Sequence, residues 1–468
     1  MDVEIGDGAL RGAERDGIRV FKAVPYAAPP VGELRFAPPR PPEPWPGVRD
    51  ATRFGPSAPQ PGPSGVVGDE NCLHLNIYAP AGGGPHPVFV WIHGGGAVIG
   101  SPNEYDGTMF ARHGVVVVTV GYRLGVLGLL HLPEVFGGGN FSLLDQVAAL
   151  RWVRDNIAAF GGDPERVTVG GESNGGRTVG TLLAAPAARG LFQRAIVQSG
   201  TGVGVVVGTP EEAATTADAV LAELGTDAGS LRDVPVRRII EAQSAVSAAS
   251  PIAVPYQVVV DGTTLPRRPI DAVAAGAARD VALLIGHNHD EQDLFAALAG
   301  VTGFRTDNSM TVDAATTAAA TAAYRELLAD WTDEQVRRHV VTSSEWWLPA
   351  IRFAEAHLAG GGRAWMYRLD WRIAPRGEGM GAPHTLDLPF VFGRVTPRLR
   401  AVLGRLDSDR AKAVTRAMHS EWIEFIADGE PGWPAYDRAE RATFLFDDSC
   451  RVVSDPDVAL RRVWDGRI

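Results

Sequence analysis

Ser173 is the residue of this 468-residue chain whose surroundings most clearly suggest chemistry. It stands in the pattern Gly-x-Ser-x-Gly, directly after the apolar run 167–169 and before a helical pattern. A serine at such a turn is a nucleophile elbow, because strained backbone lifts the hydroxyl out of the sheet and nearby glycines let the chain cross closely. A chain with 55 glycines can also produce this pattern by chance. The pattern therefore indicates an acyl-transfer nucleophile but needs support from other segments.

A second glycine-rich segment, 93–96, follows the apolar run 88–92 and has the sequence His-Gly-Gly-Gly. Loops of this type supply oxyanion donors in lipases and esterases. Successive glycines let backbone amides approach a substrate oxygen with no side chain between them. Together the two segments predict a serine hydrolase.

A hydrolase of this kind needs an acid and then a histidine after the serine. Two segments supply candidates: 286–291, which follows the apolar run 281–285, and 381–390. The pattern does not separate Glu291 from Asp290 as the acid, nor His384 from the other ten histidines as the base, because a histidine is more often a packed or solvated side chain.

The elements that must position these residues alternate between short apolar runs and helical segments, which is typical of a mostly parallel sheet with crossover helices. We expect a helix through 144–152 that ends near Gly161. The first 70 residues, rich in proline and glycine, are expected to be irregular chain laid over a core. We predict one catalytic domain over residues 1–468, with helical insertions at about 201–275 and 296–360. Seven strands are expected, at 88–92, 115–120, 167–169, 195–197, 281–285, 365–369 and 443–446.

Composition excludes several classes of function. The 44 Lys and Arg against 55 Asp and Glu give a net charge of -11, which repels nucleic acid and anionic membranes alike. We expect no signal peptide, and no stretch reaches the roughly 18 apolar residues of a membrane span. The two cysteines, Cys72 and Cys450, are too few for a disulfide framework or a zinc quartet. We therefore expect a cytoplasmic protein that binds neither nucleic acid nor a membrane.

Longer stretches of the sequence resemble the type B carboxylesterase family, which includes bacterial para-nitrobenzyl esterases and cholinesterases. Examples are Glu-Asn-Cys-Leu-His-Leu-Asn at 70–76 and Tyr-Arg-Leu-Gly at 122–125. The resemblance implies an α/β-hydrolase fold, with a central, mostly parallel sheet and helical insertions over the active-site gorge. The other matching segments are 21–27, 29–30, 34–36, 50–56, 145–146, 156–157, 160–164, 198–200, 261–262 and 290–291.

The resemblance also assigns roles by position. It implies a triad in which Ser173 is the nucleophile, Glu291 the acid and His384 the base. It implies that Ser199 is a hydroxyl near the triad and that no metal or organic cofactor is needed. The oxyanion hole is expected to consist of the backbone amides of Gly95, Gly96 and Asn174. The residues expected to line the substrate pocket are Ala97, Val98, Phe295 and Phe390. The pairs at the family's structural ion-pair positions are Arg35 with Glu70 and Arg151 with Asp163.

Several positions depart from the family. Ala58 replaces the usual partner of Cys72, so we expect no disulfide, which agrees with a reducing compartment. The segment 57–71 has no aromatic residue in place of the choline-binding tryptophan of cholinesterases, which makes choline esters poor substrates. Ala97 replaces a usual Phe and Asn174 a usual Ala, and both flank the carbonyl-binding position. A bulky, partly oxygenated ester is one consequence of these two changes, and neutral drift is the alternative. Gln292 replaces a usual Gly or Ala, and 385–387 replaces the usual Gly-x-Glu after the histidine; for Gln292 and Thr385 we favour drift.

The function expected from these observations is hydrolysis of a small-molecule carboxylic ester through an acyl-enzyme. An amide or carbamate hydrolase with the same triad is the alternative among enzymes, because a triad does not specify its leaving group. A catalytically silent binding protein of the same fold is the alternative outside enzymes. We expect a monomer, with an oligomer as the alternative.

Overall fold

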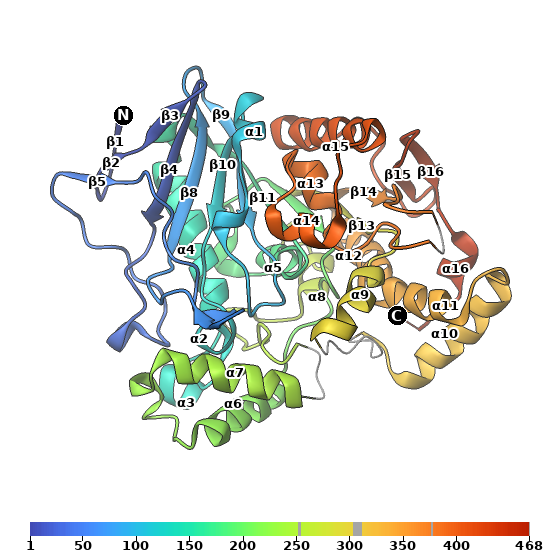
Figure 1. Cartoon of the computed structure of the whole chain (residues 1–468), viewed down its shortest axis with the longest axis horizontal. Helices are drawn as coiled ribbons and strands as arrows, with labels where there is room; N and C mark the ends of the chain where they lie inside the picture. Colours follow the sequence, from blue (N-terminus) through green and yellow to red (C-terminus); the bar gives the residue numbers. More distant parts are fainter. Residues whose placement is uncertain (251–253, 303–310, 376–377, 468) are drawn as a thin grey trace. The chain divides into compact units, whose positions relative to one another are not determined.

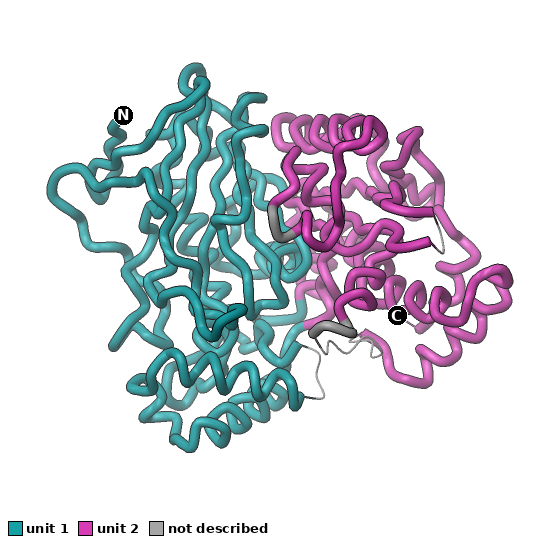
Figure 2. Tube along the Cα trace, viewed as in Figure 1, with its two compact units in different colours: residues 1–194, 207–268 teal, residues 195–206, 269–468 magenta. Residues whose placement is uncertain are grey.

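The computed structural model describes the chain except for residues 251–253, 303–310, 376–377 and 468 (Figure 1). Its residues form two compact units (Figure 2). Unit 1 comprises Met1–Arg194 and Val207–Arg268, and unit 2 comprises Ala195–Val206 and Pro269–Ile468.

Unit 1 is built on a mixed sheet with the strand order β11-β9-β10-β8-β4-β3. The central strand β9 pairs in parallel with β10 on one side and β11 on the other, and the remaining pairs are antiparallel. All five residues of β10 are buried, as expected for a continuous apolar strand covered on both faces. In sheet order the strands are Gly162–Glu172, His86–Ile92, Val116–Val120, His74–Pro80, Ile18–Pro25 and Ala13–Arg15.

Unit 2 contains strands in the order β12-β13-β14-β15-β16. The pairs β13–β14 and β14–β15 are parallel, and β16 closes the edge in the antiparallel direction. The strand β13 is buried along its whole length. The bounds are Arg194–Gln198, Ala282–Asn288, Arg363–Leu369, Ala442–Phe446 and Arg451–Ser454.

Helices cover these strands. In unit 1, α4 and α5 pack against β11, and in unit 2, α12 packs against β13 and β14. Within 201–275 the pair α6 and α7 lies side by side (Figure 1). The organisation as a single catalytic domain with insertions stays a prediction. The helices are α1 Thr108–Arg112, α2 Gly125–Leu129, α3 Pro133–Phe136, α4 Phe141–Asn156, α5 Asn174–Leu182, α6 Pro210–Leu224, α7 Val236–Ala249, α8 Pro269–Ala274, α9 Gln292–Thr302, α10 Ala314–Leu327, α11 Asp333–Thr342, α12 Leu348–Ala359, α13 Asp387–Phe392, α14 Pro397–Leu403, α15 Asp409–Asp428 and α16 Val458–Arg462.

The seven strands predicted from apolar runs are all present, as β9 to β15. The predicted helix is α4, followed by a 3₁₀ helix over Ile157–Phe160 that ends at Gly161 with a φ of 82°. The prediction for the first 70 residues was wrong, because this region contains seven strands. Six of them have three or four residues, too few to show an alternation. The longer strand β4 has a register shift between Phe21 and Val24, which breaks the period of two.

Of the two ion pairs implied by the resemblance, one is present. Arg35 Nη2 lies 2.5 Å from Glu70 Oε2. Arg151 instead donates to the Ala187 carbonyl at 3.5 Å, and Asp163 accepts from the backbone amide two residues on; no ion pair joins the two within the described residues. The carboxylate of Asp163 is engaged in its own turn, which explains why this pair was predicted wrongly. Both cysteines are free thiols.

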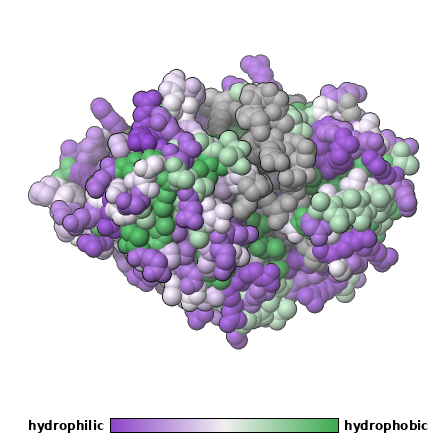
Figure 3. All heavy atoms as spheres, turned by 90° about the horizontal axis from the view of Figure 1, so that it is seen from below, coloured by the Kyte–Doolittle hydropathy of each residue, from purple (hydrophilic) through white to green (hydrophobic). Residues whose placement is uncertain are grey.

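The surface carries mixed polarity. Hydrophilic side chains cover much of the described surface on the face seen in Figure 3. None of the helices in the described ranges is long and apolar enough to cross a membrane.

Candidate active site

Ser173 occupies the turn between strand β11 and helix α5. Its φ of 59° and ψ of -124° lie in a region that non-glycine residues rarely adopt. Such strain persists only where the surrounding structure imposes it, and it is concentrated at functional sites. The side chain is half-buried at the N-terminus of α5. The backbone thus presents the hydroxyl as the sequence predicted for a nucleophile elbow.

The glycines on either side of Ser173 are required by the close approach of neighbouring backbone. A Cβ atom at Gly175 would lie 2.1 Å from the carbonyl oxygen of Ile92, and one at Gly171 would lie 2.5 Å from the Gly175 carbonyl carbon. Contacts this short cannot be accommodated without moving main chain. The spacing of the motif is therefore a steric requirement of the β9–β11–α5 crossing.

The glycine loop after β9 also has a constrained backbone. Gly95, Gly96 and Ala97 have φ values of 109°, 61° and 65°. A Cβ at Gly95 would lie 2.0 Å from the Ile99 carbonyl oxygen. Within the described residues, no hydrogen bond uses the backbone amides of Gly95, Gly96 or Asn174. These are the three amides predicted for the oxyanion hole.

The side chain of Tyr122 packs against His93, the residue that begins the glycine loop, and lies near Asn174. Its hydroxyl donates to the His93 carbonyl at 2.6 Å, and its ring stacks on the His93 imidazole with centroids 4.4 Å apart. Burial raises the pKa of Tyr122 above its usual range, and a hydrogen bond with the Asn174 side chain lowers it in part. Tyr122 therefore holds the start of the glycine loop, and the Asn174 side chain lies near its hydroxyl.

The pocket residues predicted in unit 1 lie against an apolar cluster. Ala97 is 2% exposed and belongs to a cluster with Phe36 and Val126, and the partly buried Val98 packs against the same cluster. Their role in substrate binding stays a prediction.

Unit 2 brings together the predicted acid and base. His384 Nδ1 lies 2.6 Å from Glu291 Oε2. The other oxygen of Glu291 accepts the backbone amide of Asn288 at 2.7 Å. Glu291 lies just after β13, and His384 precedes α13; both side chains are buried. A carboxylate at Nδ1 fixes the tautomer that leaves Nε2 as a proton acceptor, which is the requirement for a general base.

Aromatic rings enclose the imidazole. The Phe295 ring lies 5.1 Å and the Trp346 ring 5.6 Å from the His384 ring, and the two aromatic rings stack on each other. Trp346 belongs to a π-helical turn over Ser343–Trp347, a distortion that often marks functional sites. Phe390 is buried in α13 and packs edge-on against Trp371. Of the two pocket residues predicted in unit 2, Phe295 contacts the His384 ring and Phe390 packs in the core.

Asp387 is a second buried carboxyl group near the base, three residues after it. It accepts from Gln198 Nε2 at 2.6 Å, and Gln198 Oε1 accepts from Trp422 Nε1 at 2.8 Å. Burial raises the pKa of Asp387 to about 6; the Gln198 bond opposes this rise, and the nearby Glu291 adds to it. Sequence reasoning gave Asp387 no role, although Asp387 stands where the family usually has a Glu, and that acid was the signal that could have found it.

Ser199, predicted to lie near the triad, follows β12 in unit 2. Its amide donates to the Gly286 carbonyl of β13 at 2.9 Å, and its hydroxyl is buried without a hydrogen-bond partner among the described residues. The predicted site residues therefore form two groups: the nucleophile and the amides in unit 1, and the acid, the base and Ser199 in unit 2.

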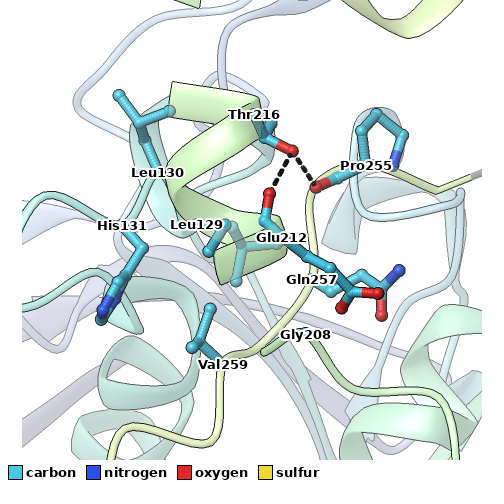
Figure 4. Close-up of a pocket in the computed structure, with 10 residues that line it drawn as sticks. Leu129, Leu130, His131, Gly208, Glu212, Thr216, Pro255, Gln257 and Val259 are labelled. Carbon is cyan, nitrogen blue, oxygen red and sulfur yellow. Dashed lines mark hydrogen bonds between the residues drawn. The ribbon is translucent and has the colours of Figure 1, made fainter. Parts of the chain in front are cut away.

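Two hollows lie apart from these predicted residues. One in unit 1, of about 10 Å³, lies beside the Thr216 hydroxyl, which donates to Glu212 O and Pro255 O (Figure 4). It has room for about one water molecule. A larger cavity of about 560 Å³ in unit 2 has Asp290, Asp293 and two arginines in its wall. In the described part of the chain, no group of three or more His, Cys, Asp or Glu side chains could hold a metal ion.

Comparison with known proteins gives consistent results. The model of the carboxylesterase family matches residues 1–449. The chain is 38% identical to the para-nitrobenzyl esterase of Bacillus subtilis (strain 168), covering 97% of this chain and 96% of that protein. It is 36% identical to the phenmedipham hydrolase of Pseudarthrobacter oxydans, covering 94% of each. A solved carboxylesterase of Geobacillus stearothermophilus is 38% identical, with a TM-score of 0.87 and 99% coverage of both chains. This structural likeness confirms the predicted α/β-hydrolase fold class.

Proposed function

This chain belongs to the carboxylesterase family and is a carboxylic ester hydrolase of the serine esterase class, and we propose that its reaction passes through an acyl-enzyme on Ser173. The observation that carries the proposal is the backbone of Ser173, a non-glycine residue held at a φ of 59° between a strand and a helix. Such strain is concentrated at functional sites, and a nucleophile elbow requires it.

In the proposed acylation step, Ser173 Oγ forms a bond to the ester carbonyl carbon while His384 Nε2 takes the hydroxyl proton. The carbonyl electron pair moves to the oxygen, and the amides of Gly95, Gly96 and Asn174 stabilise the resulting oxyanion. When this intermediate collapses, the bond to the alcohol breaks and the leaving oxygen takes the proton from Nε2. The product alcohol leaves, and the acyl group stays on Ser173.

Deacylation repeats these steps with water as the nucleophile. His384 Nε2 accepts a proton from water, whose oxygen attacks the acyl carbon, and Ser173 Oγ leaves with the proton returned by the imidazole. Glu291 stabilises the imidazolium in both halves, because its Oε2 lies 2.6 Å from Nδ1. The geometry around Glu291 and His384 supports these two roles.

The triad does not specify its leaving group, so amides and carbamates are the alternative substrates for the same residues. A nitrophenyl phosphonate label followed by peptide mapping identifies the nucleophile, and a panel of nitrophenyl esters, anilides and carbamates identifies the reaction class. We expect one phosphonate, on the peptide that contains Ser173, and faster turnover of esters than of the other two classes. Labelling of a different serine, or faster cleavage of carbamates, would contradict the proposal.

We further propose that the enzyme is a cytoplasmic monomer that acts on a bulky, partly oxygenated ester. The free thiols of Cys72 and Cys450 support a reducing compartment. The side chains of Ala97 and Asn174, beside the predicted oxyanion hole, support a bulky, partly oxygenated substrate. Ala97 has a methyl group where the family usually has the ring of Phe, which leaves more room. Asn174 has a polar carboxamide where the family usually has the methyl group of Ala. Light scattering coupled to gel filtration measures the oligomeric state, and a dimer would contradict the first part.

A further inference from the structure

The acid and the base of unit 2 lie on two segments that are hydrogen-bonded to each other along their length. We call residues 288–293 the acid loop and residues 381–384 the histidine segment. The amide of Asp290 donates to the Ala382 carbonyl at 2.9 Å, and the amide of His384 donates to the Glu291 carbonyl at 3.2 Å. The side chain of Asn288 donates to the Pro383 carbonyl at 2.8 Å. The position of the imidazole therefore depends on how the two segments are held together.

Two carboxylates that flank Glu291 complete this arrangement. Asp290 Oδ2 accepts the amide of Ala382 at 2.9 Å, and Asp293 Oδ2 accepts the amide of Gly381 at 2.9 Å. A Cβ at Gly381 would lie 2.1 Å from Asp290 Oδ2, so the close approach needs a glycine there. Consecutive amides of the histidine segment are thus bound by side chains of the acid loop.

Asp290 is held in turn by Arg372 and His289. Arg372 Nη1 donates to its Oδ2 at 2.5 Å, and His289 Nδ1 lies 3.0 Å from its Oδ1. Burial alone raises the pKa of Asp290, but His289, Arg372 and the amide of Ala382 lower it well below its usual range. The carboxylate is therefore ionised at every working pH, and its hydrogen bonds are of the stronger, charge-assisted kind.

A purely structural ion pair would stabilise the fold without affecting the reaction. The contacts of Asp290 go beyond an ion pair. Its carboxylate binds the backbone amide of Ala382, two residues before His384, and Arg372 holds that carboxylate in place. Proton transfer tolerates errors of only about 0.5 Å in a catalytic group, and misplacement by about 1 Å can reduce turnover by about 100-fold.

We propose that Asp290, held by Arg372, is a positioning residue that fixes the His384 imidazole for proton transfer. This inference rests on the proposed function of His384 and Glu291 and extends it to a residue that touches no substrate. Arg372, Asp290, Arg338 and Asp293 all line the 560 Å³ cavity of unit 2. A small cation can therefore reach the position of the Arg372 guanidinium from this cavity.

The test compares Asp290→Asn and Arg372→Ala with Glu334→Gln. Glu334 lines the same cavity and pairs with Arg337 and Arg338. Its link to the acid loop is indirect, through Arg338, which pairs with Asp293 and not with Asp290. For Asp290→Asn we expect kcat to fall by about 10- to 100-fold with KM changed by less than about twofold. The downfield proton resonance of the His384–Glu291 hydrogen bond should broaden or shift. Glu334→Gln should match the wild type in both measurements.

Arg372→Ala should lose about tenfold in kcat, and millimolar guanidinium should restore most of it, because the ion can occupy the emptied position beside Asp290. This variant decides the question if Asp290→Asn does not fold. Wild-type turnover by Arg372→Ala, or a loss that guanidinium does not restore, would then overturn the inference.

A second outcome separates this inference from the proposed function. If Asp290→Asn has a lower melting temperature but wild-type kcat at 20 °C, while Ser173→Ala is inactive, Asp290 is a structural residue and the triad stands. If Ser173→Ala is active, the proposed function itself is wrong.

Discussion

The proposed nucleophile region of unit 1 and the proposed acid–base region of unit 2 are built by different means. In unit 1, the geometry comes from the backbone: Ser173 and Ala97 have positive φ, and Gly175 lies where a Cβ would meet a carbonyl at 2.1 Å. In unit 2, it comes from side chains, since Glu291 and His384 are 93 positions apart and meet through a hydrogen bond. Steric constraints leave a local motif in the sequence, whereas side-chain contacts between distant segments do not.

Substitutions in the two regions should therefore have different effects on stability and activity. Damage to the backbone geometry of unit 1 is expected to reduce stability and activity together, because main chain has to move. Damage to the hydrogen bonds of unit 2 should change turnover and its pH dependence while the fold survives. Five measurements test this contrast.

The largest effect is expected from the triad residues themselves. Ser173→Ala should reduce kcat by roughly 10⁵- to 10⁶-fold and leave the protein folded, because the triad members act as a unit. Glu291→Gln should cost less, about 10²- to 10⁴-fold, since the acid orients the imidazole and forms no bond to substrate. Hydrolysis of a nitrophenyl ester measures both. A harmless Glu291→Gln beside a severely damaged Asp290→Asn would show that the acid is Asp290.

Gly175→Ala tests the steric basis of unit 1. We expect its free energy of unfolding to fall by about 1–3 kcal/mol, as for other overpacked sites, and activity to fall with it. Gly138→Ala is the matched control, because an added Cβ there meets no atom within 4 Å and its φ is not positive. Urea titration measures both variants. Equal stability of the two would contradict the steric account of the elbow.

Ala97→Phe tests the pocket predicted in unit 1. A ring at this position should lower kcat/KM for bulky esters relative to acetate and butyrate esters, by roughly 1–2 kcal/mol of discrimination. Because Ala97 also packs against the cluster of Phe36 and Val126, the melting temperature is measured alongside. An equal loss for short and bulky esters together with a lower melting temperature would place Ala97 in the core and outside the pocket.

The smallest effect is expected in the pH dependence of kcat/KM, which the proposed base His384 and the nearby Asp387 should determine. Activity should fall at low pH with an apparent pKa of about 6 to 7, because only a neutral imidazole accepts the serine proton. Asp387 and His384 attract each other when both are charged, so Asp387→Asn should move this midpoint down by about 0.5 unit. A pH–rate profile of kcat/KM measures the shift. An unchanged or higher midpoint would show that Asp387 does not act on the base.

Asp387→Asn should also change how the free energy of unfolding depends on pH, in a direction that the pKa of Asp387 sets. The pKa of Asp387 is raised from 3.8 to about 6 in the folded chain, so the folded state binds this proton more tightly than the unfolded state. The stability that this tighter proton binding contributes is fully present below pH 3.8 and is lost as the pH rises through about 6. Asp387→Asn should therefore gain stability relative to wild type as the pH is raised from 4 to 8. A constant difference across this range would contradict the titration.

Much of the fold was predictable from the sequence, because buried parallel strands are continuous apolar runs. All seven predicted strands are present, and the segments around Ser173 and 93–96 were identified from glycine spacing together with the apolar run that precedes each. The short strands before residue 70 were missed, because three or four residues show no period and a register shift interrupts β4. Arg151 was assigned the wrong partner, because family position does not show which acceptor a long side chain reaches.

The sequence was thus sufficient for the longer apolar strands and for the turn at Ser173, where backbone sterics demand particular residues at neighbouring positions. Among its histidines and carboxyl groups the pattern left the base and the acid open, and only the family resemblance pointed to His384 and Glu291. The tertiary structure alone decided that these two meet at 2.6 Å and that Asp290 binds the main chain beside the base. Such contacts join segments about 90 positions apart, and a hydrogen bond across that distance imposes no periodicity on the residues between them.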